Sequence, residues 1–187
     1  MSTPETRIRP QRADAQRNYD ALLAIGADLL AEHGANLPFE EVARVAVVGK
    51  GTLYRHFPTR DHLIAAVLRQ RFDQLADEAD ELLISTSSSN AVNTWLRSFD
   101  RIPERFRGLS ARVGESLADD SSAVSTACIP MKEAFARLIH KAQADQQVRT
   151  DVDPVELLGV VAALPVGLRD EEGSSRYIDV ILRGLRT

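Results

Sequence analysis

The sequence predicts an all-α protein: a small head of three helices, one long helix leading out of the head, and a larger helical body. Apolar residues recur at intervals of three and four along most of the 187 residues, as they do on one face of an α-helix. No stretch shows sustained alternation of apolar and polar residues, so we expect little or no sheet. Near residue 47, two short helical stretches are separated by only about three residues, which is typical of a helix-turn-helix.

The first predicted helix runs from about Ala13 to His33, where tyrosine and leucine side chains form a broad apolar face. Gly34 is expected to end it, because glycine accepts the left-handed conformation that closes helices. A second helix is predicted after Pro38, a residue that suits a first helical turn. Its inward-facing stripe is formed by Phe39, Val42, Ala43 and Ala46.

Residues 1–12 precede these helices and are predicted to form a flexible basic arm. The arm contains prolines and few apolar groups. Two interpretations remain open. Either its charge is incidental, or its arginines contact phosphates or a minor groove, as basic arms do. The arginines concerned are Arg7, Arg9 and Arg12.

The stretch from Val48 to Phe57 says most about function. Leu53 and Phe57 are four residues apart, so one face of a helix can bury both. The side chains on the other faces all carry hydrogen-bond donors, and they are Lys50, Thr52, Tyr54, Arg55 and His56. A short helix with this division suits the major groove of DNA, where phosphates and base edges accept hydrogen bonds. Pro58 marks the end of the helix.

The body is predicted to start with a long helix that Thr59 caps and that ends near Leu83. The clearest loop in the sequence follows at residues 85–90, which are serine, threonine and asparagine. Pro130 predicts a kink or a late helix start. Further helices are predicted over about 91–102, 104–118, 124–146, 154–164 and 176–185.

Charge and cysteine content limit the classes of function. Residues 1–72 hold 10 Lys and Arg against 8 Asp and Glu, whereas residues 73–187 hold 13 against 19. A basic end beside an acidic body suits a protein that offers one end to a polyanion. Cys128 is the only cysteine, so no intrachain disulfide is possible, and a small buried residue is favoured over a redox sensor. No metal-ligand spacing and no signal or membrane segment is evident, so we expect a cytoplasmic protein without metal or cofactor.

The residues around the third helix resemble the TetR/AcrR family of bacterial transcriptional regulators. The matching residues are Phe39–Ala43, the stretch from Gly49 to Arg60, and Leu63. Within them the run Gly-Thr-Leu-Tyr-Arg-His-Phe is highly specific for the family. The resemblance extends over about residues 13–70, and beyond them it is only an all-helical body of suitable length.

The resemblance implies a homodimeric DNA-binding regulator, most often a repressor, that a small-molecule effector releases from a double-stranded DNA operator. It divides the chain into a basic arm (1–12), a helix-turn-helix DNA-binding domain (13–58) and a ligand-binding and dimerisation domain (59–187). Carried onto matching positions, the implied DNA contacts are Lys50, Gly51, Thr52, Tyr54, Arg55, His56 and Arg60.

The body contains candidates for a ligand cavity and for a dimer seam. Five apolar side chains are either ordinary core or the lining of a ligand cavity between helices, where bundles place such sites. They are Trp95, Phe99, Phe106, Met131 and Phe135, and Arg112 is a candidate polar group inside such a cavity. On the family model, the dimer seam would comprise Val161, Leu164, Ile178, Ile181 and Leu182.

One residue departs from the family pattern. The family usually has glycine in the turn where this chain has Val47, and a β-branched residue tolerates a positive φ poorly. Either the turn takes another path here or the backbone is strained. The alternative function is a helical protein-binding module with a vestigial DNA-binding head. An enzyme is not expected, because the sequence shows no nucleophile–base pair, phosphate loop or metal cluster. The identity of the effector is not predicted.

Overall fold

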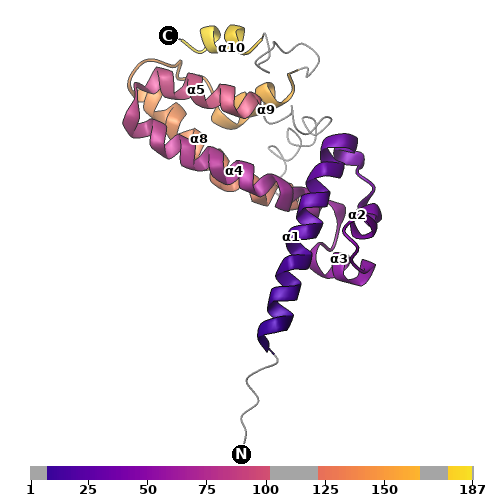
Figure 1. Cartoon of the computed structure of the whole chain (residues 1–187). Coiled ribbons are helices and arrows are strands. Elements are labelled where there is room, and N and C mark those ends of the chain that lie inside the picture. The colour runs from indigo at the N-terminus through magenta and orange to yellow at the C-terminus, as the bar shows by residue number, and fades with distance from the viewer. Residues whose placement is uncertain (1–7, 102–121, 165–176, 187) are drawn as a thin grey trace, which may run out of the picture.

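The computed structural model describes residues 8–101, 122–164 and 177–186. Eight α-helices and one 3₁₀ turn, with no strand, make up the secondary structure of these described residues (Figure 1). The predicted all-α class is therefore confirmed. The helices form a small N-terminal head, a long connecting helix and a C-terminal body.

The head comprises α1 (Ile8–His33), α2 (Phe39–Val45) and α3 (Lys50–His56). The predicted end of α1 is confirmed, because Gly34 has a φ of 60° and begins a 3₁₀ turn, Gly34–Asn36. The three helices bury one small apolar core, whose fully buried side chains are Leu22, Leu30, Leu37, Val42 and Leu53. This core fixes the orientation of α3 relative to α1 and α2.

Helix α1 begins five residues before the predicted start at Ala13. Pro10 is the third residue of the helix. The first turn of a helix has no internal acceptors for its N–H groups, so a proline there removes no hydrogen bond. Part of the predicted flexible arm, residues 8–12, is thus helical, while residues 1–7 lie outside the described residues. In Figure 1 the first turns of α1 extend beyond α2 and α3.

Helix α4 (Arg60–Ser85) connects the head to the body. As predicted, Thr59 is its N-cap, and the Thr59 hydroxyl accepts a hydrogen bond from the backbone N–H of His62 at 3.4 Å. Its 26 residues span about 39 Å at 1.5 Å per residue. The helix packs against α1 in the head and against α5 and α8 in the body, so one rigid element touches both parts.

The body contains α5 (Ser88–Asp100), α8 (Ala123–Ala144), α9 (Pro154–Ala162) and α10 (Ile178–Gly184). Its centre is the indole ring of Trp95, which is stacked on Phe135 with ring centroids 4.5 Å apart. The Trp95 Nε1–H donates to the backbone carbonyl of Leu75 at 2.7 Å. A buried indole with a satisfied donor joins the connecting helix to the body core.

Two expectations for the body are corrected. The predicted loop at 85–90 is too long, because Ser87 caps α5 by accepting from the backbone N–H of Asn90 and the helix starts at Ser88. Serine favours helix N-caps as well as loops, and that ambiguity caused the error. Helix α8 runs through Pro130 without ending, so the late start is also wrong. The helix predicted over 104–118 lies outside the described residues.

Candidate nucleic-acid interface

Helix α3 presents its polar side chains on the surface of the head. Leu53 is fully buried and Phe57 is 2% exposed, as their spacing predicted. Lys50, Tyr54 and Arg55 are exposed. Gly51 is exposed as well, and a Cβ added there would meet nothing within 4 Å. Thr52 and His56 are half-buried. The structure thus places all six candidate contacts of the helix together on one short surface element.

Val47 keeps the left-handed turn in which the family usually has glycine. Its φ is 54°, and its side chain is 92% exposed. The backbone N–H of Val48 donates to the carbonyl of Ala43 at 2.9 Å, which closes the turn between α2 and α3. Of the two possibilities left open by the sequence, the structure has the strained one. A non-glycine residue in this region costs about 1–3 kcal/mol.

The carboxylate of Glu40, in the first turn of α2, bridges two candidate DNA contacts of α3. The Lys50 ammonium donates to Glu40 Oε2 at 2.5 Å, and the Tyr54 hydroxyl donates to Glu40 Oε1 at 3.3 Å. The hydrogen bond and charge of Lys50, with a smaller contribution from Tyr54, hold the pKa of Glu40 below its usual value. The Tyr54 ring also stands edge-on against Phe39, with centroids 5.4 Å apart.

This role of Glu40 was not predicted from the sequence, and Glu40 is not among the candidate site residues named above. Glu40 precedes Lys50 by ten residues and Tyr54 by fourteen, so no helical spacing relates them. The available signal was a helix-turn-helix with an acidic residue at the start of one helix and basic residues on the next. Only the crossing of α2 and α3 brings these groups into contact.

The remaining candidate contacts differ in their freedom to bind. The ring of His56 packs edge-on against Tyr19 of α1, with centroids 5.7 Å apart, and so lies at the base of the interface. Arg55 and Arg60 are exposed. Neither of their guanidinium groups is within hydrogen-bonding distance of another group in the described part of the chain. Arg60 begins α4 beside α3, where an arginine can reach a phosphate.

The candidate ligand residues of the body form packed core as far as they are described. Trp95, Phe99, Met131 and Phe135 are at most 2% exposed, and the Phe99 ring stacks on Trp95 with centroids 5.6 Å apart. Phe106 and Arg112 lie outside the described residues. This packing supports the core interpretation for the four described residues.

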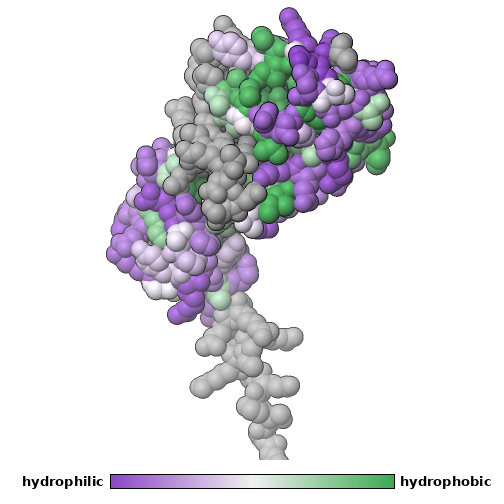
Figure 2. Space-filling model, turned by 180° about the vertical axis from the view of Figure 1, so that it is seen from behind, coloured by the Kyte–Doolittle hydropathy of each residue, from purple (hydrophilic) through white to green (hydrophobic). Residues whose placement is uncertain are grey.

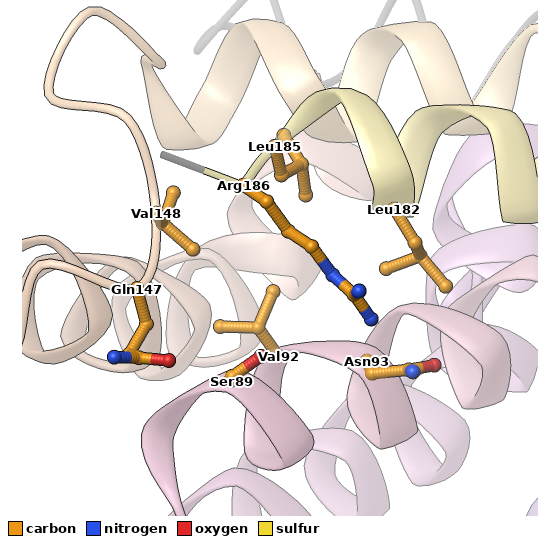
Figure 3. Close-up of a pocket in the computed structure, with 8 residues that line it drawn as sticks. All are labelled: Ser89, Val92, Asn93, Gln147, Val148, Leu182, Leu185 and Arg186. Atoms are coloured by element: carbon orange, nitrogen blue, oxygen red, sulfur yellow. The ribbon is translucent and has the colours of Figure 1, made fainter.

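A shallow hollow lies elsewhere on the body, between α5, α10 and the segment that follows α8 (Figure 3). It is open to solvent, and its cavity volume is only about 20 Å³. Val92 and Asn93 line one side and Leu182 lines the other, while the side chain of Arg186 reaches across it. None of the four described candidates, Trp95, Phe99, Met131 and Phe135, is among the residues that line this hollow.

The predicted dimer seam is only partly available to a partner. Val161 and Ile178 are 1% exposed and pack inside their own chain, so the prediction is wrong for these two. Leu164, Ile181 and Leu182 are half-buried. The same two helices and their flanks expose other apolar side chains, namely Val155, Val160, Tyr177 and Val180. Figure 2 shows apolar residues gathered on the body, whereas the visible surface of the head is mostly hydrophilic.

Other groups of the described chain offer little chemistry. Cys128 is buried, and burial raises the pKa of its thiol to about 12, as expected for a structural cysteine. Among the described residues, no three His, Cys, Asp or Glu side chains come close enough together to hold a metal ion. None of the helices described combines the length and apolar character that crossing a bilayer requires.

Comparison with known proteins gives a consistent result along the chain. Residues 22–67 match the model of the bacterial regulatory proteins of the tetR family. Residues 87–187 match the model of the C-terminal domain of SbtR-like transcriptional regulators. A TetR transcription regulatory protein from Mycobacterium vanbaalenii has a similar crystal structure, with 32% identity, a TM-score of 0.56, and coverage of 95% of this chain and 100% of that one.

Two curated relatives match over a shorter region. The HTH-type transcriptional regulator SAR0097 of Staphylococcus aureus is 34% identical over 42% of this chain and 42% of that protein. The HTH-type transcriptional repressor Rv3405c of Mycobacterium tuberculosis is 30% identical over 54% of this chain and 53% of that protein. The chain thus spans about half or less of the length of these curated relatives.

Proposed function

Because the chain belongs to the TetR family of bacterial regulatory proteins, we propose that it is a DNA-binding transcriptional repressor. In this proposal it works in the cytoplasm as a homodimer, and a small-molecule effector releases it from its operator. Residues 13–58 read the DNA, and residues 59–187 bind the effector and the second subunit. The arginines of residues 1–12 add contacts to phosphates.

One observation carries the proposal, namely the placement of α3. The helix buries Leu53 and Phe57 and leaves Lys50, Tyr54 and Arg55 exposed. A helix of this kind fits the major groove. Its cationic and hydroxyl side chains can bind the phosphates that flank the groove, and a guanidinium can make two hydrogen bonds to the edge of a guanine within it. Tyr54 and Thr52 are assigned to phosphates, Arg55 and Lys50 to base edges, and Arg60 to a flanking phosphate.

The same geometry supports the homodimer. A helix as short as α3 touches only a few base pairs, so two copies on a near-palindromic operator are needed for a specific site. The exposed apolar side chains of α9 and α10, Val160 and Val180 among them, supply a surface for the second copy. The repressor function is favoured by the name of the mycobacterial relative.

Effector control is assigned to α4. This helix packs against α1 in the head and against α5 and α8 in the body. An effector that changed its tilt would change the distance between the two copies of α3, and operator affinity would fall. By thermodynamic reciprocity, bound operator would weaken effector binding by the same factor. No enzymatic activity is proposed.

The test uses a variant that leaves the buried face of α3 intact. Tyr54→Ala combined with Arg55→Ala should abolish binding to the duplex that the wild-type protein selects from a random library. Circular dichroism and light scattering should show unchanged helix content and subunit number. Unchanged affinity of the double variant would refute these contact assignments. Genomic footprinting of the tagged protein then identifies the operator, and the neighbouring genes point to the effector.

A salt series separates DNA binding from the protein-binding alternative. Phosphate contacts release counterions, so the affinity of a DNA-binding head falls steeply as salt rises. Lack of binding to any duplex at low salt would favour a head that binds a protein.

A further inference from the structure

Glu40 is placed among the groups that face DNA in the proposed function. Its carboxylate accepts hydrogen bonds from Lys50 and Tyr54, which are four residues apart on the same face of α3. The side chains of Lys50 and Glu40 are 66% and 53% exposed. An ion pair this exposed contributes little to folding stability, so its main consequence concerns what the surface binds.

A carboxylate at this position acts against phosphate binding. On a duplex of arbitrary sequence Lys50 has no matching base edge, so its ammonium would bind a phosphate instead. To do so, the ammonium must leave Glu40, or the carboxylate must approach the phosphate as a like charge. Either event opposes binding to any duplex, whatever its sequence. The neighbouring Glu41 differs, because it pairs with Arg44 within α2 and does not touch α3 in the described contacts.

The same carboxylate orders the side chains it holds. Lysine has many rotamers, and fixing one before binding reduces the entropy lost on binding. Tyr54 is held from two sides, by Glu40 at its hydroxyl and by Phe39 at its ring. Lys50 and Tyr54 are therefore held in one arrangement on α3. Only a DNA site whose acceptors match that arrangement can bind both side chains without rearranging them.

We propose that Glu40 is a specificity-determining residue that weakens binding to duplexes of arbitrary sequence while presenting Lys50 and Tyr54 to the operator. The inference rests on the proposed binding of DNA by α3. It assigns to an acidic residue of α2 a role in discrimination between DNA sites. Glu40 acts through Lys50 and Tyr54, without itself needing to contact a base.

The test compares Glu40→Gln with the matched control Glu41→Gln, which removes the same charge from the adjacent residue. Two fluorescent duplexes are titrated from about 50 to 200 mM salt. One has a fixed arbitrary sequence, and the other is the duplex that the wild-type protein selects from a random library. We expect Glu40→Gln to bind the arbitrary duplex about two- to fivefold more tightly. Its salt slope should steepen by about one, and its preference for the selected duplex should fall.

Glu41→Gln serves as the control for loss of charge, and Lys50→Met tests whether the effect of Glu40→Gln depends on Lys50. Glu41→Gln should change the arbitrary-duplex affinity by less than about twofold. In a Lys50→Met background the steeper salt slope of Glu40→Gln should disappear, because the freed ammonium that would contact a phosphate is absent. Equal effects of Glu40→Gln and Glu41→Gln, in variants with wild-type helix content, would overturn this inference alone. Failure of the wild-type protein to bind either duplex would overturn the proposed function together with it.

Discussion

Gly26 of α1 lies so close to Leu63 of α4 that a Cβ added at Gly26 would sit 2.9 Å from Leu63 Cδ1. Leu63 is fully buried, so its side chain has little room to yield. This contact sets how closely the head packs on the connecting helix. A change in the tilt of α4 can reach α3 only if this contact between α1 and α4 is maintained.

The first prediction concerns this contact. Gly26→Val should destabilise the protein by about 1–3 kcal/mol, the usual cost of overpacking a filled core, as measured by urea denaturation. Leu63→Ala alone should also destabilise, because it leaves a cavity. The double variant should lose less stability than the sum of the two, since the smaller side chain makes room for the valine. Additive losses would show that the two residues do not compete for one space.

The second prediction tests the strain at Val47. Val47→Gly should raise the free energy of unfolding by about 1 kcal/mol, because glycine adopts φ near +54° without strain at a modest entropic cost. The matched control is Val45→Gly in α2, where the backbone is helical and glycine should lower stability by up to about 1 kcal/mol. Thermal melts of the two variants should thus move in opposite directions. A lowered melting temperature for Val47→Gly would mean that the turn is not strained.

A third prediction concerns the pH dependence of the Glu40 cluster. Lys50 holds the pKa of Glu40 below the ordinary value of 4.5. The folded protein therefore keeps this carboxylate charged at a pH where the unfolded chain has begun to protonate it. The resulting stabilisation is complete above about pH 4.5 and is lost as the pH falls through the folded pKa.

Carbon-detected NMR of the glutamate carboxyl groups would measure this shift. Lys50→Met should return the pKa of Glu40 toward 4.5, because the main cause of its depression is removed. The pKa of Glu41, which Arg44 lowers, should stay where it is in the same variant. Equal titration of Glu40 in the wild type and in Lys50→Met would contradict the ion pair.

The fourth prediction concerns the reactivity of Cys128. With a pKa of about 12, only about one thiol in ten thousand is ionised at pH 8, and the thiolate is the reactive form. Native protein should therefore react with an aromatic disulfide reagent at least about a hundred times more slowly than protein unfolded in guanidinium. Rapid labelling of the native chain would place Cys128 near the surface and revive the redox interpretation.

The fifth prediction tests the surface offered to a second subunit. Val180→Asp should convert the proposed dimer to monomer at micromolar concentrations, because a charge buried in an apolar interface is costly. Ile84→Asp is the control, since Ile84 is 88% exposed at the far end of α4. Sedimentation velocity would distinguish the two. A dimer that persists in Val180→Asp would exclude the exposed face of α10 from the interface.

The local features of the head could be predicted because they depend on neighbours in sequence. The apolar spacing of Leu53 and Phe57, the glycine at residue 34 and the Thr59 cap each act within one or two helical turns. The start of α1 was placed too late, because a proline in a first turn can be read as either a helix start or an end to the arm. Because the apolar core of the head is small, the three helices can bury their apolar faces in few arrangements.

The sequence by itself determined the helical class, the inward face of α3 and the family to which the chain belongs, because these follow from periodicity and from a contiguous motif. Only the tertiary structure decided that Val47 keeps a left-handed turn, that Glu40 holds Lys50 and Tyr54, and that Val161 and Ile178 are buried in their own chain. Each of these depends on how separate helices cross. The positions of such crossings are set by packing among residues distant in the chain, which no local pattern specifies.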